Sequence, residues 1–402
     1  MRYSSHTTVN HVFIFIQIFE AEGGIQSYVK NILQAYLSLE SQTDNQTAAE
    51  VFLLRDSPNC ENPFDAPPFK FHYLKTENPH LERLRFSAAL LRCLWQKRPN
   101  HIFCGHINLA PLTRLICQPL GIPYTVLTYG KEVWERLPNL QQQALASAAE
   151  IWTISRYSRD RACAANNLDP NKIKILSCMV DGNTFTPGAK SPALIEKYGL
   201  EGAKVLMTVA RLWSGDIYKG VDVTIRAISA MASPAGGIAK VFPEVKYLVI
   251  GRGDDQPRLA KLAQDLGVAD RVVFAGFVPT EELAEHYRVA DAYIMPSQEG
   301  FGIVYLEAMA CGKPVLSGDA DGSSDPLQDG RLGWQVPHRN PDAVAAACIE
   351  ILKGEDRRCN GEWLREQSLA LFSKDAMKEQ LKQLLYPTTV TSQMALQESS
   401  LF

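Results

Sequence analysis

The sequence predicts an α/β protein of two Rossmann-like domains that face a cleft. Three observations support this prediction. Short β-branched runs alternate with amphipathic helical stretches along most of the chain, which is the pattern of parallel sheets covered by helices. The alternation stops once, at a stretch rich in Asp, Gly and Pro over residues 181–192, and then starts again. The length of 402 residues is sufficient for two or three domains.

The N-terminal half, residues 1–186, starts with an apolar run at 12–18 that predicts a strand, followed by a helical pattern at 25–38. Later apolar runs are likewise followed by helical patterns. They predict strands over 49–54, 101–104, 124–128 and 151–154. In such parallel sheets ligands bind at the carboxyl ends of the strands, so the residues that follow each strand are the candidates for a site.

The C-terminal half, residues 187–386, repeats this pattern. Its predicted strands are 205–209, 247–250, 272–274, 292–295 and 315–317. The last helical segment, 363–385, can pack on either domain. Residues 387–402 are rich in Ser, Thr and Gln and are expected to form a disordered tail.

Composition excludes several classes of protein. Apolar residues make up 46% and charged residues 21%, which is typical of a globular chain, and a net charge of −3 argues against a nucleic-acid binder. The nine cysteines form no C-x-x-C pair, so we expect neither a zinc site nor a disulfide framework. The longest N-terminal apolar stretch, 11–19, is too short to span a bilayer and lacks a cleavage site. We therefore expect a cytoplasmic protein.

The densest chemical signal follows the fourth predicted strand of the second half, over residues 297–310. Gly300 and Gly302 let a ligand approach the backbone, and the start of the next helix offers free N–H groups. Glu299 and Glu307 would lie up to ~12 Å apart in a helix. An acid/base pair of a retaining glycosidase needs about 5 Å. The two carboxylates therefore suit hydroxyl groups on two parts of one long ligand, unless they are only a helix cap and a solvated helix residue.

Two further loops carry weaker signals. Arg211 and Lys219 flank the loop after strand 205–209 and suit a diphosphate, although a solvated loop has the same composition. The pair Gly23 and Gly24 forms either an anion-binding turn or an ordinary tight turn. Neither this pair nor the loop at 251–254 has the G-x-G-x-x-G spacing, which argues against a nicotinamide-dependent dehydrogenase.

Taken together, these pieces resemble the retaining, GT-B-fold glycosyltransferases of family 4 (glycosyl transferases group 1). The matching pieces follow in the order and at the spacing of that family: 23–26, 211–212, 218–220, 250–254, 273–278, 299–307 and 311–315. The resemblance is strong over 203–340 and diffuse before 185. It implies a GT-B fold with an N-terminal acceptor-binding domain and a C-terminal nucleotide-sugar-binding domain.

The implied reaction moves a hexose or N-acetylhexosamine from a UDP- or GDP-sugar to a saccharide or lipid-linked saccharide, as in polysaccharide biosynthesis. By the resemblance, Arg211 and Lys219 hold the donor diphosphate and stabilise the leaving nucleotide. Glu299 binds hydroxyls of the donor sugar and completes the set of catalytic candidates. Glu307 accepts hydrogen bonds from the ribose. The other implied donor contacts are Gly24 at the phosphate, Arg252 and Val278 at the base, and the backbone at Phe301, Gly302 and Ile303.

The sequence departs from the family at one position. Many members place a histidine after the strand that here ends at residue 128, where this chain has Tyr129. Tyr129 can still donate a hydrogen bond to the transferred sugar. His106, after strand 101–104, is a second candidate for a sugar or acceptor contact, with a helix-start role as the alternative.

The resemblance implies that no divalent metal or cofactor is needed. Breaking a glycosyl–phosphate bond puts negative charge on the diphosphate, and fixed cations such as Arg211 and Lys219 lower that barrier. Asp319, Asp321 and Asp325 resemble carboxylate ligands of Mg²⁺ or Mn²⁺, but they lie in a glycine-rich loop that the family uses without metal. Since the sequence offers no obvious enzyme nucleophile, same-face attack by the acceptor is the preferred route to retention.

Two other functions remain open. A sugar-nucleotide epimerase of the same fold would need acid/base residues on both sides of the sugar. A non-catalytic nucleotide-sugar-binding subunit would keep Arg211, Lys219 and Glu307 but could lose the sugar-facing Glu299. The presence of Glu299 favours an enzyme.

Residues 81–98 combine five cations with one acid, and Leu84, Ala88, Leu91 and Trp95 recur at helical spacing. A basic amphipathic helix suits peripheral contact with the inner face of a membrane. The alternative is a sheet-packed helix with a solvated basic face.

Overall fold

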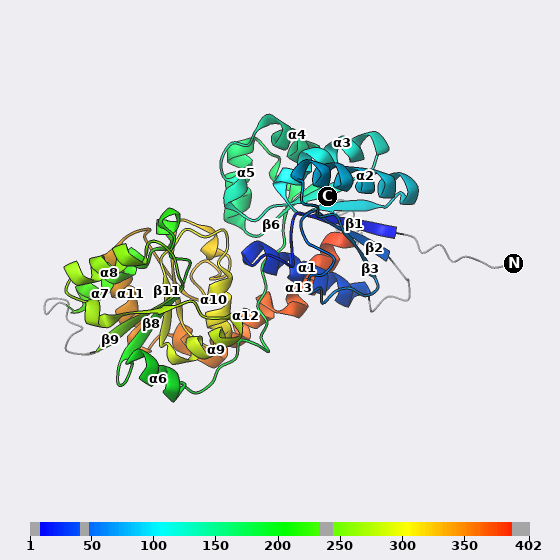
Figure 1. Ribbon diagram of the computed structural model, residues 1–402. Coiled ribbons are helices and arrows are strands. Elements are labelled where there is room, and N and C mark those ends of the chain that lie inside the picture. Colours follow the sequence, from blue (N-terminus) through cyan, green and yellow to red (C-terminus); the bar gives the residue numbers. More distant parts are fainter. Residues whose placement is uncertain (1–8, 41–47, 233–243, 388–402) are drawn as a thin grey trace, which may run out of the picture. The chain divides into compact units, whose positions relative to one another are not determined.

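The computed structural model describes residues 9–40, 48–232 and 244–387 (Figure 1). The chain divides into two compact units, the first formed by Met1–Cys178 with Lys374–Phe402 and the second by Met179–Ser373. Each unit contains one parallel sheet with helices on both faces, which confirms the predicted fold class. The boundary after residue 186 stays a prediction. Of the expected disordered tail, all but Pro387 lies outside the described residues.

The sheet of the first unit has seven parallel strands in the order β3-β2-β1-β4-β5-β6-β7. Its strands are β1 (Val9–Phe15), β2 (Ala48–Leu53), β3 (Phe69–Tyr73), β4 (His101–Cys104), β5 (Tyr124–Leu127), β6 (Glu150–Thr153) and β7 (Ile173–Ile175). Its helices are α1 (Gly24–Glu40), α2 (Pro79–Lys97), α3 (Ala110–Leu120), α4 (Asn139–Ser147), α5 (Arg156–Asn166) and α13 (Lys374–Leu385), with short 3₁₀ turns η1 (Ile107–Leu109), η2 (Lys131–Val133) and η3 (Pro170–Lys172).

Alternate residues of the interior strand β1 face opposite layers of helices, as the period of two in a strand requires. Val12 and Ile14 belong to the core that includes buried residues of α2, α3, α4 and α5. Phe13 instead contacts Tyr36 of α1 edge to face, with ring centroids 5.2 Å apart. Helix α13 packs against α1 although the two come from opposite ends of the chain (Figure 1). One face of the sheet is thus covered by α2–α5 and the other by α1 and α13.

The sheet of the second unit has six parallel strands in the order β10-β9-β8-β11-β12-β13. Its strands are β8 (Lys204–Val209), β9 (Val245–Ile250), β10 (Val272–Gly276), β11 (Ala292–Met295), β12 (Val315–Gly318) and β13 (Trp334–Val336). Its helices are α6 (Pro192–Tyr198), α7 (Val221–Ala232), α8 (Gln256–Asp265), α9 (Thr280–Val289), α10 (Ile303–Ala310), α11 (Pro341–Lys353) and α12 (Gly361–Phe372). The 3₁₀ turns are η4 (Ser214–Lys219), η6 (Ala269–Arg271), η7 (Gly322–Ser324) and η8 (Arg357–Cys359). Helices α7, α8 and α11 share one core with the sheet, whereas α10 packs with α9 and α12.

The helical segment predicted over 363–385 is not one helix. It is divided into α12 and α13 at Ser373, whose φ of −76° and ψ of 172° are those of extended backbone. One extended residue redirects the chain, so α12 packs on α10 in the second unit and α13 on α1 in the first. The apolar periodicity continues through Ser373 and for that reason does not reveal the break.

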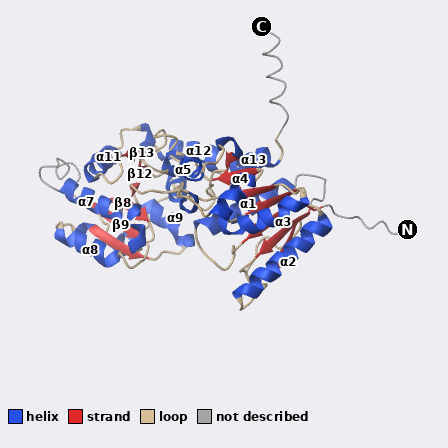
Figure 2. Ribbon diagram, turned by 90° about the horizontal axis from the view of Figure 1, so that it is seen from above, coloured by secondary structure: helices blue, strands red, loops and turns tan. Residues whose placement is uncertain are grey.

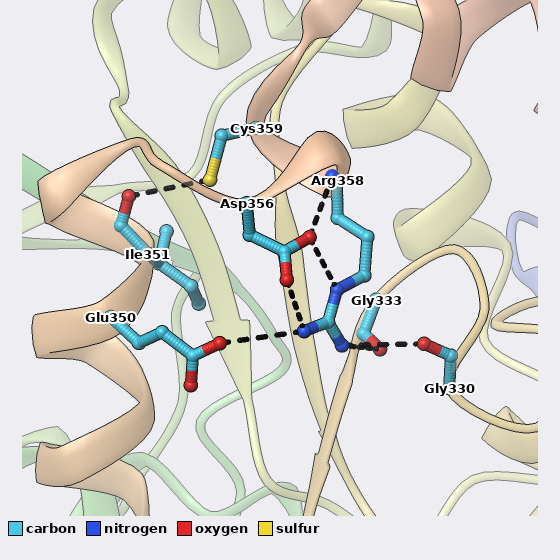
Figure 3. Close-up of polar contacts among 7 residues, drawn as sticks. All are labelled: Gly330, Gly333, Glu350, Ile351, Asp356, Arg358 and Cys359. Atoms are coloured by element: carbon cyan, nitrogen blue, oxygen red, sulfur yellow. Dashed lines mark hydrogen bonds and ion pairs between the residues drawn. The ribbon is translucent and has the colours of Figure 1, made fainter.

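Arg358 fastens the end of the long connection between β12 and β13 (Figure 3). Its guanidinium donates to the carboxylate of Asp356 at 2.8 and 2.9 Å. It also donates to the carbonyl oxygens of Gly330 at 3.3 Å and Gly333 at 3.1 Å, and lies 3.7 Å from the ring centroid of Trp334. This planar cation thereby holds the connection against η8 and β13.

Candidate functional site

Each sheet has one place where the strand order reverses direction. In the second unit β8 lies between β9 and β11, so the loops after β8 and β11 start beside each other. Arg211 and Lys219 follow β8, and Glu299 follows β11. In the first unit the same relationship joins β1, which precedes Gly24, to β4, which precedes His106. Ligands of open parallel sheets bind at such switch points.

The loops after β8 and β9 lie in close contact because two glycines allow it. A Cβ atom on Gly251, whose φ is +135°, would lie 1.8 Å from the carbonyl oxygen of Ala210. A Cβ atom on Gly253 would lie 1.8 Å from that of Leu212. The N–H group of Leu212 donates to the carbonyl of Arg252 at 3.0 Å, which fixes the two loops to each other.

Two arginines at this edge lie over exposed aromatic rings. The guanidinium carbon of Arg211 is 5.5 Å from the ring centroid of Trp213, and that of Arg252 is 4.7 Å from the ring centroid of Phe277. The predicted base contact Val278 is itself buried. Aromatic rings and arginine guanidinium planes are both flat surfaces on which a base can stack. Sequence reasoning missed Trp213 and Phe277, and the available signal was a large aromatic residue just after a strand end.

Lys219 and Glu299 form an ion pair between the loops after β8 and β11, and both side chains are largely buried. The neighbouring Gly220 has a φ of +75°, and a Cβ atom there would lie 2.4 Å from the carbonyl oxygen of Pro296. Only glycine permits this approach of the two loops. The structure therefore brings together two of the three predicted catalytic residues.

The peptide at Glu299 is held on both sides by the turn that follows β12. Its N–H group donates to Oδ2 of Asp321 at 2.6 Å, and its carbonyl accepts from the N–H group of Gly322 at 2.8 Å. The second oxygen of Asp321 accepts from the N–H group of Ser323 at 2.8 Å. Burial raises the pKa of Asp321 to about 7, although the hydrogen bonds from Ser323 and from the Glu299 backbone lower it.

Two of the aspartates that resemble metal ligands, Asp319 and Asp321, have backbone N–H groups as partners. Asp321 accepts backbone N–H groups, and Asp319 accepts the N–H group of His338 at 3.1 Å. Within the described ranges, no group of three or more His, Cys, Asp or Glu side chains could hold a metal ion. The contact between Asp321 and the Glu299 loop is not predictable from sequence, since the two residues follow different strands.

Glu307 lies on α10 and accepts a hydrogen bond from the hydroxyl group of Tyr287 at 2.7 Å. Burial raises the pKa of Glu307 to about 7, and the Tyr287 hydrogen bond acts in the opposite direction. Tyr287, Tyr293 and Tyr305 form a buried aromatic cluster under the site, with successive ring centroids 5.7 and 5.8 Å apart. This rigid support fixes Glu307, whose Oε1 can accept hydrogen bonds from a ligand.

The segment between Glu299 and Glu307 can contact a ligand through its backbone groups rather than through its side chains. Phe301 is buried with its ring against Phe372, 5.8 Å between centroids. Gly302 has a φ of +91°, and a Cβ atom there would lie 2.5 Å from the ring of Tyr305. Ile303 begins α10, where the first N–H groups lack partners within the helix.

The three predicted site residues of the first unit differ in how accessible they are to a ligand. Gly24 is the exposed first residue of α1, with no atom within 4 Å of where a Cβ would lie. His106 caps η1, because its Nδ1 accepts the N–H group of Asn108 at 3.1 Å. The hydroxyl group of Tyr129 is buried and donates to the carbonyl of Gly105 at 2.6 Å. A sugar contact by His106 or Tyr129 stays a prediction, and the geometry favours His106.

Comparison with known proteins shows what the second unit is similar to. Residues 203–354 match the family model described as glycosyl transferases group 1. A GDP-mannose-dependent alpha-(1-6)-phosphatidylinositol monomannoside mannosyltransferase of Mycolicibacterium smegmatis is 34% identical over 239 residues, which cover 56% of this chain and 59% of that protein. A D-inositol 3-phosphate glycosyltransferase of Geodermatophilus obscurus is 36% identical over 301 residues, 70% of this chain and 66% of that protein. The chain thus covers less than two thirds of these relatives.

Solved structures agree on the fold. A glycosyltransferase from Rickettsia africae superposes with a TM-score of 0.73 over 94% of this chain and 99% of its own, at 15% identity. The GT-B fold and the resemblance to family-4 glycosyltransferases, both predicted from the motifs, are confirmed.

Proposed function

We propose that this chain, whose residues 203–354 match the family model of glycosyl transferases group 1, transfers a hexose from a nucleotide-sugar to a saccharide or lipid-linked saccharide with retention of configuration. The observation that carries the proposal is the Lys219–Glu299 pair at the switch point of the second sheet. In this proposal the cation of the pair binds the diphosphate and the carboxylate binds the sugar hydroxyls. Glu307, supported by Tyr287, supplies a second carboxylate for the ribose.

The chemistry follows from charge. When the bond between the sugar and the diphosphate breaks, the electron pair leaves with the diphosphate and negative charge grows there. Lys219 and Arg211 face that charge and stabilise it without a metal ion. The acceptor hydroxyl attacks the sugar carbon on the same face, and its proton passes to the departing phosphate oxygen.

The donor proposed for the first test is GDP-mannose, because the M. smegmatis relative is named as GDP-mannose-dependent. Arg252 and Phe277 are the proposed platform for the base. UDP-hexoses and UDP-N-acetylhexosamines are the comparison donors. A saccharide or lipid-linked saccharide is the proposed acceptor.

Binding and turnover should be measured separately. Thermal-shift screening with GDP, UDP, ADP and their sugar conjugates, with and without EDTA, identifies the base and tests metal independence. Glu307→Ala and Lys219→Ala should reduce the shift, whereas Lys261→Ala, at an exposed lysine on α8 of the same unit, should not. Epimer formation without transfer would support an epimerase. Binding without any turnover would support a non-catalytic subunit.

We also propose that the protein contacts the inner face of a membrane peripherally, through residues 81–98. Helix α2 packs on its sheet through buried residues such as Phe86 and Leu90. Its other side presents an apolar stripe, in which Leu84 is 67% and Trp95 is 65% exposed. Figure 2 shows α2 on the outside of the unit. The helix is sheet-packed, as the alternative expects, but the stripe faces solvent.

The exposed charges beside this stripe are cationic. Arg83, Arg85 and Arg92 are exposed, whereas the one acid of α2, Glu82, is buried and paired with Arg55 at 3.5 Å. A cationic surface with a central apolar stripe fits anionic lipid headgroups and the upper acyl region.

The neighbouring helices α3 and α4 extend this surface. They contain no acidic residue, and their Leu115 and Leu140 are 72% and 64% exposed. A groove is lined by leucine, proline, Arg114 and Gln118 side chains of α3 and by Leu140 of α4. Within the described ranges, no helix is long and apolar enough to cross a membrane.

Flotation with neutral and with anionic vesicles tests this contact. The wild-type protein should float only with the anionic vesicles, and the double variants Arg85→Gln/Arg92→Gln and Leu84→Gln/Trp95→Gln should stay behind. Arg226→Gln, at an exposed arginine of α7, is the charge-matched control. Wild-type protein that stays in the soluble fraction with both vesicle types would refute the contact.

A further inference from the structure

Asp321 is a buried carboxylate beside the proposed donor site that the reaction chemistry does not use. It precedes η7 and is 2% exposed. Both carboxylate oxygens are occupied: Oδ2 by the N–H group of Glu299 at 2.6 Å and Oδ1 by the N–H group of Ser323 at 2.8 Å. The hydroxyl group of Ser323 also donates to Oδ1. An unpaired carboxylate would be costly to bury, so these donors explain how Asp321 is tolerated.

The same turn holds Glu299 from the opposite side of its residue. The N–H group of Gly322 donates to the carbonyl of Glu299 at 2.8 Å. Rotation of the backbone at Glu299 would therefore break two hydrogen bonds at once. The side chain that this backbone carries is the one paired with Lys219.

The turn itself is attached to ordered parts of the second unit. The hydroxyl oxygen of Ser323 also lies 3.2 Å from the carbonyl oxygen of Gly318 at the end of β12, so its one proton is shared between this carbonyl and Asp321. The amide of Gln335 on β13 donates to the hydroxyl oxygen of Ser324 at 2.9 Å. Arg358 fixes the far end of the same connection (Figure 3). The position of β12 and β13 is thus transmitted through Asp321 to Glu299.

We infer that Asp321 is a positioning residue that fixes the Glu299 backbone so that the Glu299 carboxylate is held for the hydroxyls of the donor sugar. The inference rests on the proposed function and deepens it. Recognition of the sugar part of the donor thus depends on the Asp321 carboxylate, although Asp321 does not itself touch the sugar. Binding of the nucleotide part, through Arg211, Arg252 and Glu307, does not depend on it.

A carboxylate is required at this position because two backbone N–H groups point at it. Asparagine has the same shape but offers one acceptor oxygen and one NH₂ donor group. In Asp321→Asn, one of the N–H groups of Glu299 and Ser323 would face another donor. Asp319→Asn is the matched control in the same connection, since exposed Asp319 accepts the N–H group of His338 through Oδ1, and an amide oxygen can replace that.

The test separates sugar binding from nucleotide binding. Dissociation constants for GDP and for GDP-mannose (or for the nucleotide series that the wild-type protein binds) are measured by calorimetry. The proteins are wild type, Glu299→Ala, Asp321→Asn, the double variant Glu299→Ala/Asp321→Asn and the control Asp319→Asn. We expect Asp321→Asn to weaken nucleotide-sugar binding about tenfold while affinity for the nucleoside diphosphate stays nearly unchanged. In the Glu299→Ala background, Asp321→Asn should add nothing.

Two results would overturn the inference: equal loss of affinity for both ligands, or a full effect of Asp321→Asn that persists without the Glu299 carboxylate. If Asp321→Asn does not fold, Ser323→Ala, which removes only the hydroxyl donor, is the second variant. It should also weaken nucleotide-sugar binding more than nucleoside diphosphate binding, but by a smaller factor. Hydrogen exchange over 297–302 needs no ligand, and the Glu299 amide should exchange faster in Asp321→Asn. Unchanged exchange of the Glu299 amide would contradict the inference that Asp321 fixes the Glu299 backbone. Wild-type protein that binds neither ligand would refute the proposed function and, with it, the role inferred for Asp321.

Discussion

Lys219 and Glu299, 80 residues apart in the chain, form an ion pair where the loops after β8 and β11 meet. The pair links a residue proposed for the diphosphate with one proposed for the sugar. The ammonium group of Lys219 has three N–H donors, so it can hold a donor diphosphate while it stays beside Glu299. The second oxygen of the Glu299 carboxylate can accept hydrogen bonds from the sugar hydroxyls.

Lys219→Ala should lower the rate of transfer about 10²-fold or more, because it removes a fixed cation from the leaving group. Nucleotide binding should weaken as well, since the diphosphate loses a charge partner. Lys219→Arg should recover part of the activity, because it keeps the positive charge but carries it on a planar guanidinium group instead of an ammonium group. Initial rates and dissociation constants, with Lys261→Ala as the control, check this. Turnover within twofold of the wild type would exclude Lys219 from the reaction.

The pH dependence of nucleotide binding should report Glu307. The pKa of Glu307 is raised to about 7 by burial, so this carboxylate gains a proton as the pH falls through 7. A protonated carboxyl group is a weaker acceptor for the ribose hydroxyls, and affinity should therefore decrease from pH 8 to pH 6. Tyr287→Phe removes the hydrogen bond that lowers this pKa, which should move the transition to higher pH.

Dissociation constants measured between pH 5.5 and 8.5 test this assignment. Glu307→Gln should bind more weakly at pH 8 and should lose most of the pH dependence. A profile in Glu307→Gln that matches the wild type would assign the titration to another group, such as Asp321, whose pKa is also raised to about 7.

The extent to which this fold is predictable differs between sheet interior and sheet edge. Apolar residues dominate the interior strands of both sheets, and alternation with helices identifies them. The missed strands β3, β7 and β13 lie at the edges of their sheets. Polar residues interrupt them, such as Lys70 and His72 in β3, because an edge strand is partly solvated. Apolar runs alone do not find such strands.

The site shows the same division. The motifs of single segments, taken together, predict Arg211, Lys219, Glu299 and Glu307 as site residues. The contacts that join segments, such as Asp321 with the Glu299 backbone, depend on which strand ends become neighbours. Sequence periodicity carries no information on that pairing, so the sequence does not predict the contact between Asp321 and the Glu299 backbone.

Arg358→Ala should destabilise the second unit through its pair with Asp356. Arg358 holds the pKa of Asp356 down to about 2. A carboxylate with a depressed pKa contributes stability above its unfolded value near 4, and this contribution disappears as the pH falls toward 2. We expect a loss of about 1–2 kcal/mol in the free energy of unfolding at pH 7, after a discount for solvent screening. Urea unfolding at pH 7 and pH 3 checks this, and the difference between the wild type and Arg358→Ala should be smaller at pH 3.

Gly220→Ala should separate Lys219 from Glu299. The resulting loss of transfer activity should exceed what its loss of stability alone would cause. Gly220 has a φ of +75° and a Cβ there would meet the carbonyl oxygen of Pro296 at 2.4 Å. Gly199, the residue after α6, is the matched control: its φ is +59°, but a Cβ there meets no atom within 4 Å. Each alanine should cost about 1–2 kcal/mol of stability from its left-handed backbone.

Only Gly220→Ala adds a collision that pushes the loop after β8 away from the loop after β11. Its transfer activity should therefore fall well below that of Gly199→Ala when both are compared at a temperature where each is folded. Melting curves establish that temperature, and initial rates with saturating donor give the comparison. Equal activities in the two variants would mean that close contact between these loops is not needed for transfer, because the strain of a positive φ is common to both while the collision with Pro296 is not.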